Sequence, residues 1–142
     1  MNAPFKSLLL FVVLLLFICS CKQNTKTEHL PPNKKLISFK SKLAFTSDDL
    51  DKLDTNLYKK IISNRFNKET DTIRYSKGKI YISYLKATSG CSEYVGDIKF
   101  NKDTLKLLLN NASDTVCSER NVCRVIYEIE NKRNKSYLIE KD

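Results

Sequence analysis

The sequence has few of the residues from which enzymes build their most recognisable sites. It contains three glycines, one histidine and no tryptophan among 142 residues. With so few glycines there is no phosphate-cradling loop, and the HExxH, GxSxG and Walker patterns are also absent. The signatures of the common metalloproteases, serine hydrolases and nucleotide-binding proteins are therefore missing.

The single histidine, His29, lies in a polar segment with no cysteine or cluster of carboxylates around it. A metal or catalytic role is not expected for it. No CxxC pair occurs, and no histidine follows residue 29, so a Cys–His enzyme is not expected either. We predict no catalytic residue, no metal site and no cofactor.

The N-terminus has the layout of a secretory signal, with one positive charge at Lys6 and an apolar run that ends at Ile18. That run is too short to span a bilayer core, which needs roughly 20 apolar residues. We predict a signal peptide over 1–20, a flexible tether over 21–35 and a single globular domain over 36–142.

Ile18-Cys19-Ser20-Cys21 resembles the lipobox of bacterial lipoproteins, in which an aliphatic residue at −3 and a small residue at −1 precede the acylated cysteine. The match places the acylated position at Cys21, because Cys19 would directly follow the bulky Ile18. Each buried methylene contributes about 0.8 kcal/mol, so two or three acyl chains hold essentially irreversibly. The resemblance implies a lipid anchor in the bacterial cell envelope, at the periplasmic or surface face of the outer membrane.

Positive charge exceeds negative charge, with 25 Lys and Arg against 16 Asp and Glu, for a formal net charge of +9. The lysines are dispersed, and no short basic block stands out. An exported protein meets membrane phosphates before nucleic acid, so we predict no nucleic-acid partner. We interpret the excess of positive charge mainly as a generally basic surface. A functional interpretation is weak attraction to an anionic membrane.

The stretch 90–129 predicts a β-hairpin with a defined register. One register places the apolar partners on the same face, across a four-residue loop over 101–104. In this register Phe100 pairs with Leu105, Ile98 with Leu107 and Gly96 with Leu109. A second hairpin is predicted around Lys77-Gly78, and its second arm, 79–85, is apolar on both faces and typical of a central strand.

An amphipathic helix is predicted after a first strand in which Ile37, Phe39, Leu43 and Phe45 share a buried face. Thr46 is its expected N-cap, with Asp49 in the capping-box position. One apolar stripe follows at Leu50, Leu53, Leu57 and Ile61, and Lys59, Lys60 and Arg65 complement the dipole in its last turns.

The strand pattern continues to the C-terminus. Val125, Tyr127 and Ile129 are predicted to share a face with Cys123, and a last strand over 136–140 is predicted to pair Ile129 with Tyr137 and Tyr127 with Ile139. The expected fold class is α+β, mostly an antiparallel sheet arranged as a meander, small sandwich or barrel-like structure, with one N-terminal amphipathic helix.

Cys91, Cys117 and Cys123 remain after acylation of Cys21, an odd number that predicts one disulfide and one thiol. Loop-closure entropy gives about 3.5 kcal/mol for Cys91–Cys117 and about 2.4 kcal/mol for Cys117–Cys123. Strain can offset that difference, so both pairings stay open. We prefer Cys91–Cys117, with Cys123 as the free, buried thiol.

Two resemblances extend into the folded body. The first is to a module of uncharacterised small lipoproteins of Bacteroidota, which this chain resembles at Asp103-Thr104-Leu105-x-Leu107, Cys117 and Tyr127-x-Ile129. Gly90-Cys91-Ser92-x-Tyr94-x-Gly96 with Cys117 is similar to the pattern of META-type domains, although Ser92 replaces the usual Asn and the family's tryptophan is absent. Both imply an envelope lipoprotein, and neither carries catalytic residues to transfer.

A non-enzymatic binding or structural module of the envelope, with an unknown protein or envelope ligand, is the function that these features favour. A periplasmic inhibitor or immunity-type protein is the alternative within that class. A carboxylate-dependent hydrolase is the competing class, and it would need Glu93 to be brought together with Asp97 or Glu119.

Overall fold

The computed structural model describes residues 32–63, 65–113, 115 and 117–142. The predicted signal peptide, Cys21 and His29 lie outside the described residues. The described chain forms β1 (Leu36–Phe45), α2 (Ser47–Leu50), α3 (Thr55–Ile62), β2 (Thr72–Ser76), β3 (Lys79–Ser89), β4 (Tyr94–Asn101), β5 (Thr104–Asn111), β6 (Arg120–Glu130) and β7 (Leu138–Lys141).

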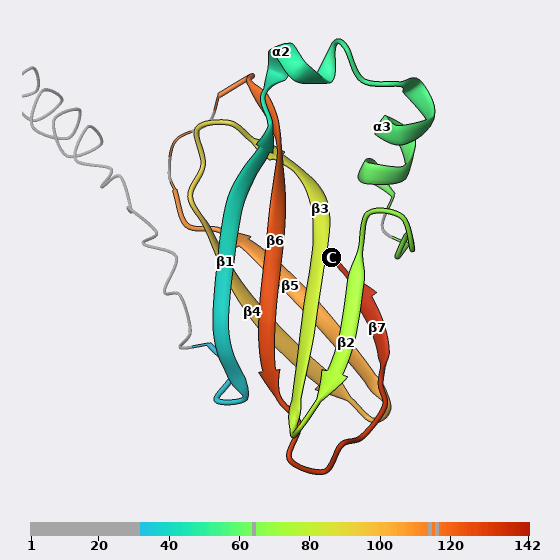
Figure 1. Ribbon diagram of the computed structural model, residues 1–142. Helices are drawn as coiled ribbons and strands as arrows, with labels where there is room; N and C mark the ends of the chain where they lie inside the picture. The colour runs from blue at the N-terminus through green and yellow to red at the C-terminus, as the bar shows by residue number, and fades with distance from the viewer. Residues whose placement is uncertain (1–31, 64, 114, 116) are drawn as a thin grey trace, which may run out of the picture.

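Two packed sheets make up the body of the protein (Figure 1), so the α+β, mostly antiparallel prediction is confirmed in the form of a sandwich and not of a closed barrel. One sheet has the strand order β1-β6-β3-β2 and the other has the order β4-β5-β7. The apolar core lies between them and contains Ile80, Ile82, Tyr84, Ile98, Leu105, Leu107, Val125, Tyr127 and Ile129.

Strand β3 is buried on both faces, as predicted for a central strand. Ile80, Ile82 and Tyr84 point into the core between the sheets and have no exposed surface. Leu85 points the other way, into a second cluster with Ile61 of α3 and with Val122. The helices therefore cover the outer face of the first sheet at one end of the sandwich.

Both predicted hairpins are present. Lys77 and Gly78 have φ values of 36° and 79°, the left-handed conformation that a tight turn of this kind requires. The predicted register of β4 with β5 is confirmed from Gly96↔Leu109 to Phe100↔Leu105. The ladder continues one pair further, to Asn101↔Thr104, so the connection is two residues long and not four.

The helix predicted from Thr46 starts where expected, with a complete capping box between Thr46 and Asp49. The apolar stripe is divided between two helices, α2 and α3. Asp54 is the N-cap of α3, and its side chain accepts hydrogen bonds from Asn56 N and Leu57 N. The predicted positions Leu50, Leu53 and Leu57 nevertheless all pack against the second cluster, which contains Ile61.

The apolar residues of β1 do not share one face, contrary to the prediction. Register shifts interrupt its pairing with β6 between Leu36 and Ser38 and between Leu43 and Phe45. A shift of one residue moves the following side chains to the opposite face. Phe39 packs into the main core, whereas Phe45, which follows the second shift, packs into the second cluster. Leu43 lies before that shift and is 59% exposed.

The predicted antiparallel pairing of the last strand with 123–130 is wrong. Strand β7 leaves the first sheet and pairs in parallel with β5, with Leu105 opposite Ile139. Strand β6 instead pairs with β1 and β3, which come much earlier in the chain, so the topology is no meander. Ile139 still reaches the main core, from the other sheet.

Candidate functional site

The segment from Arg65 to Asp71, between α3 and β2, is built around the Asp71 carboxylate. Its Oδ2 accepts from Asn67 N at 2.9 Å, and its Oδ1 accepts from Thr70 Oγ1 at 3.0 Å. The Lys141 ammonium donates to Oδ2 at 2.8 Å, and both side chains of this ion pair are 3% exposed. The loop is therefore held by a charge-assisted bond from the last strand.

Two aromatic rings lie close to the Lys141 ammonium. Its Nζ lies 4.9 Å from the centre of the Phe66 ring and 5.2 Å from that of Tyr84. Phe66 and Tyr84 contact each other edge to face, with their ring centres 6.0 Å apart. Cation–π attraction and apolar packing thus fix Phe66, and with it the loop, onto β3.

A surface cavity of about 500 Å³ lies between this loop and the C-terminal end of α3. Four cationic side chains line it, against the single carboxylate of Glu69, which pairs with Lys60 at 2.6 Å. Lys59 and Lys60 also complement the dipole of α3, but Arg65 and Lys68 follow the end of that helix. The lining residues are Lys59, Lys60, Ser63, Arg65, Phe66, Asn67, Lys68 and Glu69.

The chemistry of this basic cavity suits an anionic group with several oxygen acceptors. Lysine ammonium and arginine guanidinium groups donate to phosphate and carboxylate oxygens without themselves accepting. A cluster of like charge on a low-dielectric wall also raises the local concentration of counter-ions. The cavity could not be predicted from the sequence, in which Lys59, Lys60 and Arg65 are expected at one helix end. Asp71 instead holds the turn that places Lys68 opposite these residues.

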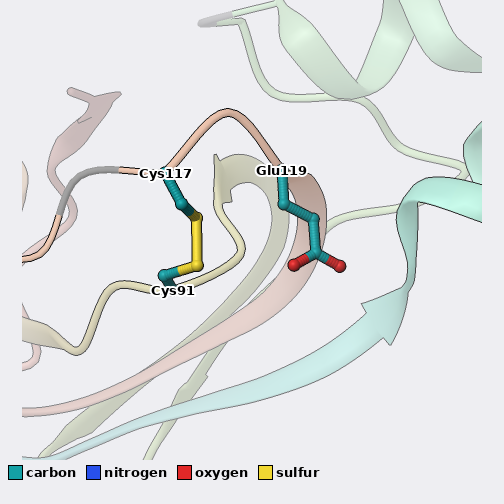
Figure 2. Close-up of side chains that lie close together, drawn as sticks. All are labelled: Cys91, Cys117 and Glu119. Atoms are coloured by element: carbon teal, nitrogen blue, oxygen red, sulfur yellow. A yellow bond between two sulfur atoms is a disulfide. The ribbon is translucent and has the colours of Figure 1, made fainter.

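The predicted cysteine site lies at the connection between the ends of β3 and β6. Cys91 and Cys117 lie at disulfide distance, with Cα atoms 5.9 Å apart, which is consistent with the preferred pairing. Figure 2 shows the Glu119 carboxylate beside the two sulfur atoms. Cys123 is a free thiol, half-buried on β6, and accepts from Thr88 Oγ1 at 3.4 Å.

The three carboxylates that a hydrolase would need lie in different surroundings. Glu93 and Glu119 are exposed to solvent. Asp97 is committed to structure, since its Oδ1 accepts from the backbone N–H groups of Asn33 and Ile98, both at 2.7 Å. Asp97 thereby connects the segment that precedes β1 with strand β4.

Comparison of the chain with family models, with curated proteins and with solved structures finds no match. The described residues themselves are therefore what indicates a function. Within this part of the chain, no helix has the length and apolar character needed to cross a membrane.

Proposed function

We propose that this protein is a lipid-anchored, non-enzymatic binding protein of the bacterial cell envelope that takes an anionic group of its ligand in the basic cavity. Acylation at Cys21, in the Ile18-Cys19-Ser20-Cys21 sequence, holds it to the outer membrane. The Cys91–Cys117 disulfide staples its folded body.

The single observation that carries the binding role is the position of four cations around one cavity, two on α3 and two on a loop that a buried ion pair holds in place. A binding site gains affinity when its groups are held in place before the ligand arrives. The buried Asp71–Lys141 pair provides this for the loop that bears Arg65 and Lys68.

The place of the cavity in the fold fits a tethered receptor. The chain enters β1 at one end of the sandwich, whereas α3 lies at the other end (Figure 1). The cavity is lined by residues from the last turn of α3 and from the segment that follows it. A tether that ends near Leu36 therefore leaves the cavity on the side remote from the attachment point.

The carboxylates support binding over hydrolysis. An acid–base pair needs two carboxyl groups whose surroundings push their proton affinities apart. The buried Asp71 is neutralised by Lys141, and Glu93 and Glu119 lie in solvent.

The binding role is tested by charge reversal in the acylated full chain, purified in a non-ionic detergent and titrated with inorganic pyrophosphate. Lys59→Glu with Lys68→Glu should weaken binding by about tenfold or more, because exposed ion contacts contribute about 0.2–1 kcal/mol each and both become repulsive. Lys42→Glu with Lys99→Glu is the matched control, since these exposed lysines lie on β1 and β4.

The control should change affinity by about twofold at most at physiological salt, where charges are screened over about 8 Å. Equal weakening by both pairs of substitutions, or no binding by the unaltered protein, would contradict the assignment of the cavity.

The anchor is tested separately by metabolic labelling with a fatty acid. Cys21→Ser should abolish labelling and block normal processing, whereas Cys19→Ser should retain both. Labelling that persists in Cys21→Ser and disappears in Cys19→Ser would place the lipid on the other cysteine.

A further inference from the structure

Backbone hydrogen bonds between the ends of β3 and β6 bring three potential metal ligands near one another. The ladder between these strands extends to Ser89↔Arg120, two residues before Cys91 and three after Cys117. Beyond it, Gly90 N donates to Glu119 O at 2.9 Å. The two cysteines and Glu119 therefore stay neighbours whether or not their sulfur atoms are bonded.

The ligand atoms of Cys91, Cys117 and Glu119 all lie within 4.8 Å of one another. A tetrahedral zinc ion, with Zn–S of about 2.3 Å and Zn–O of about 2.0–2.2 Å, holds its ligand atoms roughly 3.5–3.8 Å apart. The Cα separation of 5.9 Å between the cysteines lets the sulfur atoms move to that spacing by side-chain rotation. In the disulfide form neither sulfur is a thiolate, so metal binding requires reduction.

We propose that reduction of Cys91–Cys117 creates a zinc site in which the two thiolates and the Glu119 carboxylate bind the ion and water takes the fourth position. A dithiol of the thioredoxin-like class transfers two electrons and two protons to the disulfide and is itself oxidised to a disulfide. Zinc then displaces both thiol protons into solvent. Disulfide and zinc are thus alternative states of the same residues.

The surroundings allow both steps. Cys91 and Glu119 are exposed and Cys117 is half-buried, so a reductant and a hydrated ion can reach the site. The Ser89 hydroxyl lies 3.5 Å from Cys117 Sγ, where it can donate to a bound thiolate as an outer hydrogen bond.

Cobalt(II) titration tests the site, because thiolate ligands give Co²⁺ a charge-transfer absorption and tetrahedral geometry gives it a visible band. The acylated full chain is reduced with a phosphine, freed of reductant without oxygen and titrated, then zinc is added. One equivalent of Co²⁺ should bind with both absorptions and be displaced by zinc, while the oxidised protein should show neither absorption.

Variants assign the ligands. Cys91→Ser and Cys117→Ser should lose the thiolate absorption, and Cys123→Ser, the matched control, should keep it. Glu119→Gln retains the disulfide, and its affinity for Co²⁺ in the reduced form should fall about tenfold, in the range for loss of a metal-site partner. Far-ultraviolet circular dichroism of each reduced variant verifies the fold.

No thiolate absorption in reduced, folded protein would overturn the proposal. Loss of the absorption in Cys123→Ser with retention in Cys91→Ser would also overturn it. Neither outcome bears on anion binding at the cavity beside α3, which uses none of these residues.

Discussion

Lys141 Nζ lies 2.8 Å from Asp71 Oδ2, and this ion pair joins the last strand of one sheet to the loop that leads into the edge strand of the other. Both side chains are 3% exposed, so the pair is a buried one. Tyr75 Oη donates to the Tyr137 carbonyl at 3.2 Å along the same edge. The C-terminal residues thus close one side of the sandwich and hold the wall of the basic cavity.

Lys141→Met should lower the free energy of unfolding by about 3–5 kcal/mol, because it leaves the Asp71 carboxylate buried without a counter-charge. Lys132→Met is the control, since Lys132 pairs with Glu130 at 2.8 Å while its side chain is 80% exposed. That substitution should leave the free energy of unfolding nearly unchanged, because solvent-exposed ion pairs contribute little to stability. Urea unfolding followed by circular dichroism measures both, and similar losses would show that the buried pair does not hold the fold.

Tyr127→Phe and Tyr84→Phe should differ although both tyrosines are fully buried and stacked. Tyr127 Oη donates to the Leu108 carbonyl of β5 at 2.7 Å, and its loss should cost about 1–3 kcal/mol. The Tyr84 hydroxyl has no hydrogen-bond partner among the described residues, so Tyr84→Phe should be neutral or stabilising. Thermal unfolding of the two variants compares them, and a larger loss for Tyr84→Phe would contradict this account.

Alkaline pH should destabilise the protein through the same two tyrosines. Burial raises the pKa of Tyr84 to about 12, and burial is also the largest cause of the raised pKa of Tyr127. In the unfolded chain tyrosine ionises near pH 10, so above that pH the unfolded state binds fewer protons than the folded state. The contribution of these two tyrosines to the free energy of unfolding should be constant below about pH 10 and fall above it.

The expected slope is up to about 1.4 kcal/mol per pH unit for each buried tyrosine. Tyr84→Phe should reduce the slope between about pH 10 and 12, where Tyr84 stays protonated in the folded state and ionises in the unfolded state. Urea midpoints collected over this range give the slope, and an unchanged slope in Tyr84→Phe would show that Tyr84 does not resist ionisation.

Cys91→Ser should lower the free energy of unfolding by about 2–5 kcal/mol, the usual loss when a small disulfide-bonded domain loses its native disulfide. Cys123→Ser should cost less, because the half-buried Cys123 makes only a weak contact with Thr88. Mass spectrometry of unreduced peptides tests the pairing directly. A linked Cys117–Cys123 peptide with alkylated Cys91 is the result that would refute it.

Features set by neighbours along the chain could be predicted from the sequence. The register of β4 with β5 follows from side chains that alternate with a period of two, and only one register buries Ile98 against Leu107. Thr46 and Asp49 cap each other three residues apart, wherever the helix packs. The residues of β3 are apolar on both faces, and this local pattern already indicated a central strand.

Only the tertiary structure decided which distant segments meet. Strand β7 has an apolar pattern that suits either sheet, and it pairs with β5 because that position buries Ile139 in the core and brings Lys141 to Asp71. The register shifts in β1 and the basic cavity depend in the same way on contacts between segments that lie far apart in the chain. Hydrophobic period and turn chemistry act over a few residues, whereas the partner of a strand is selected by the burial and charge pairing of the whole molecule.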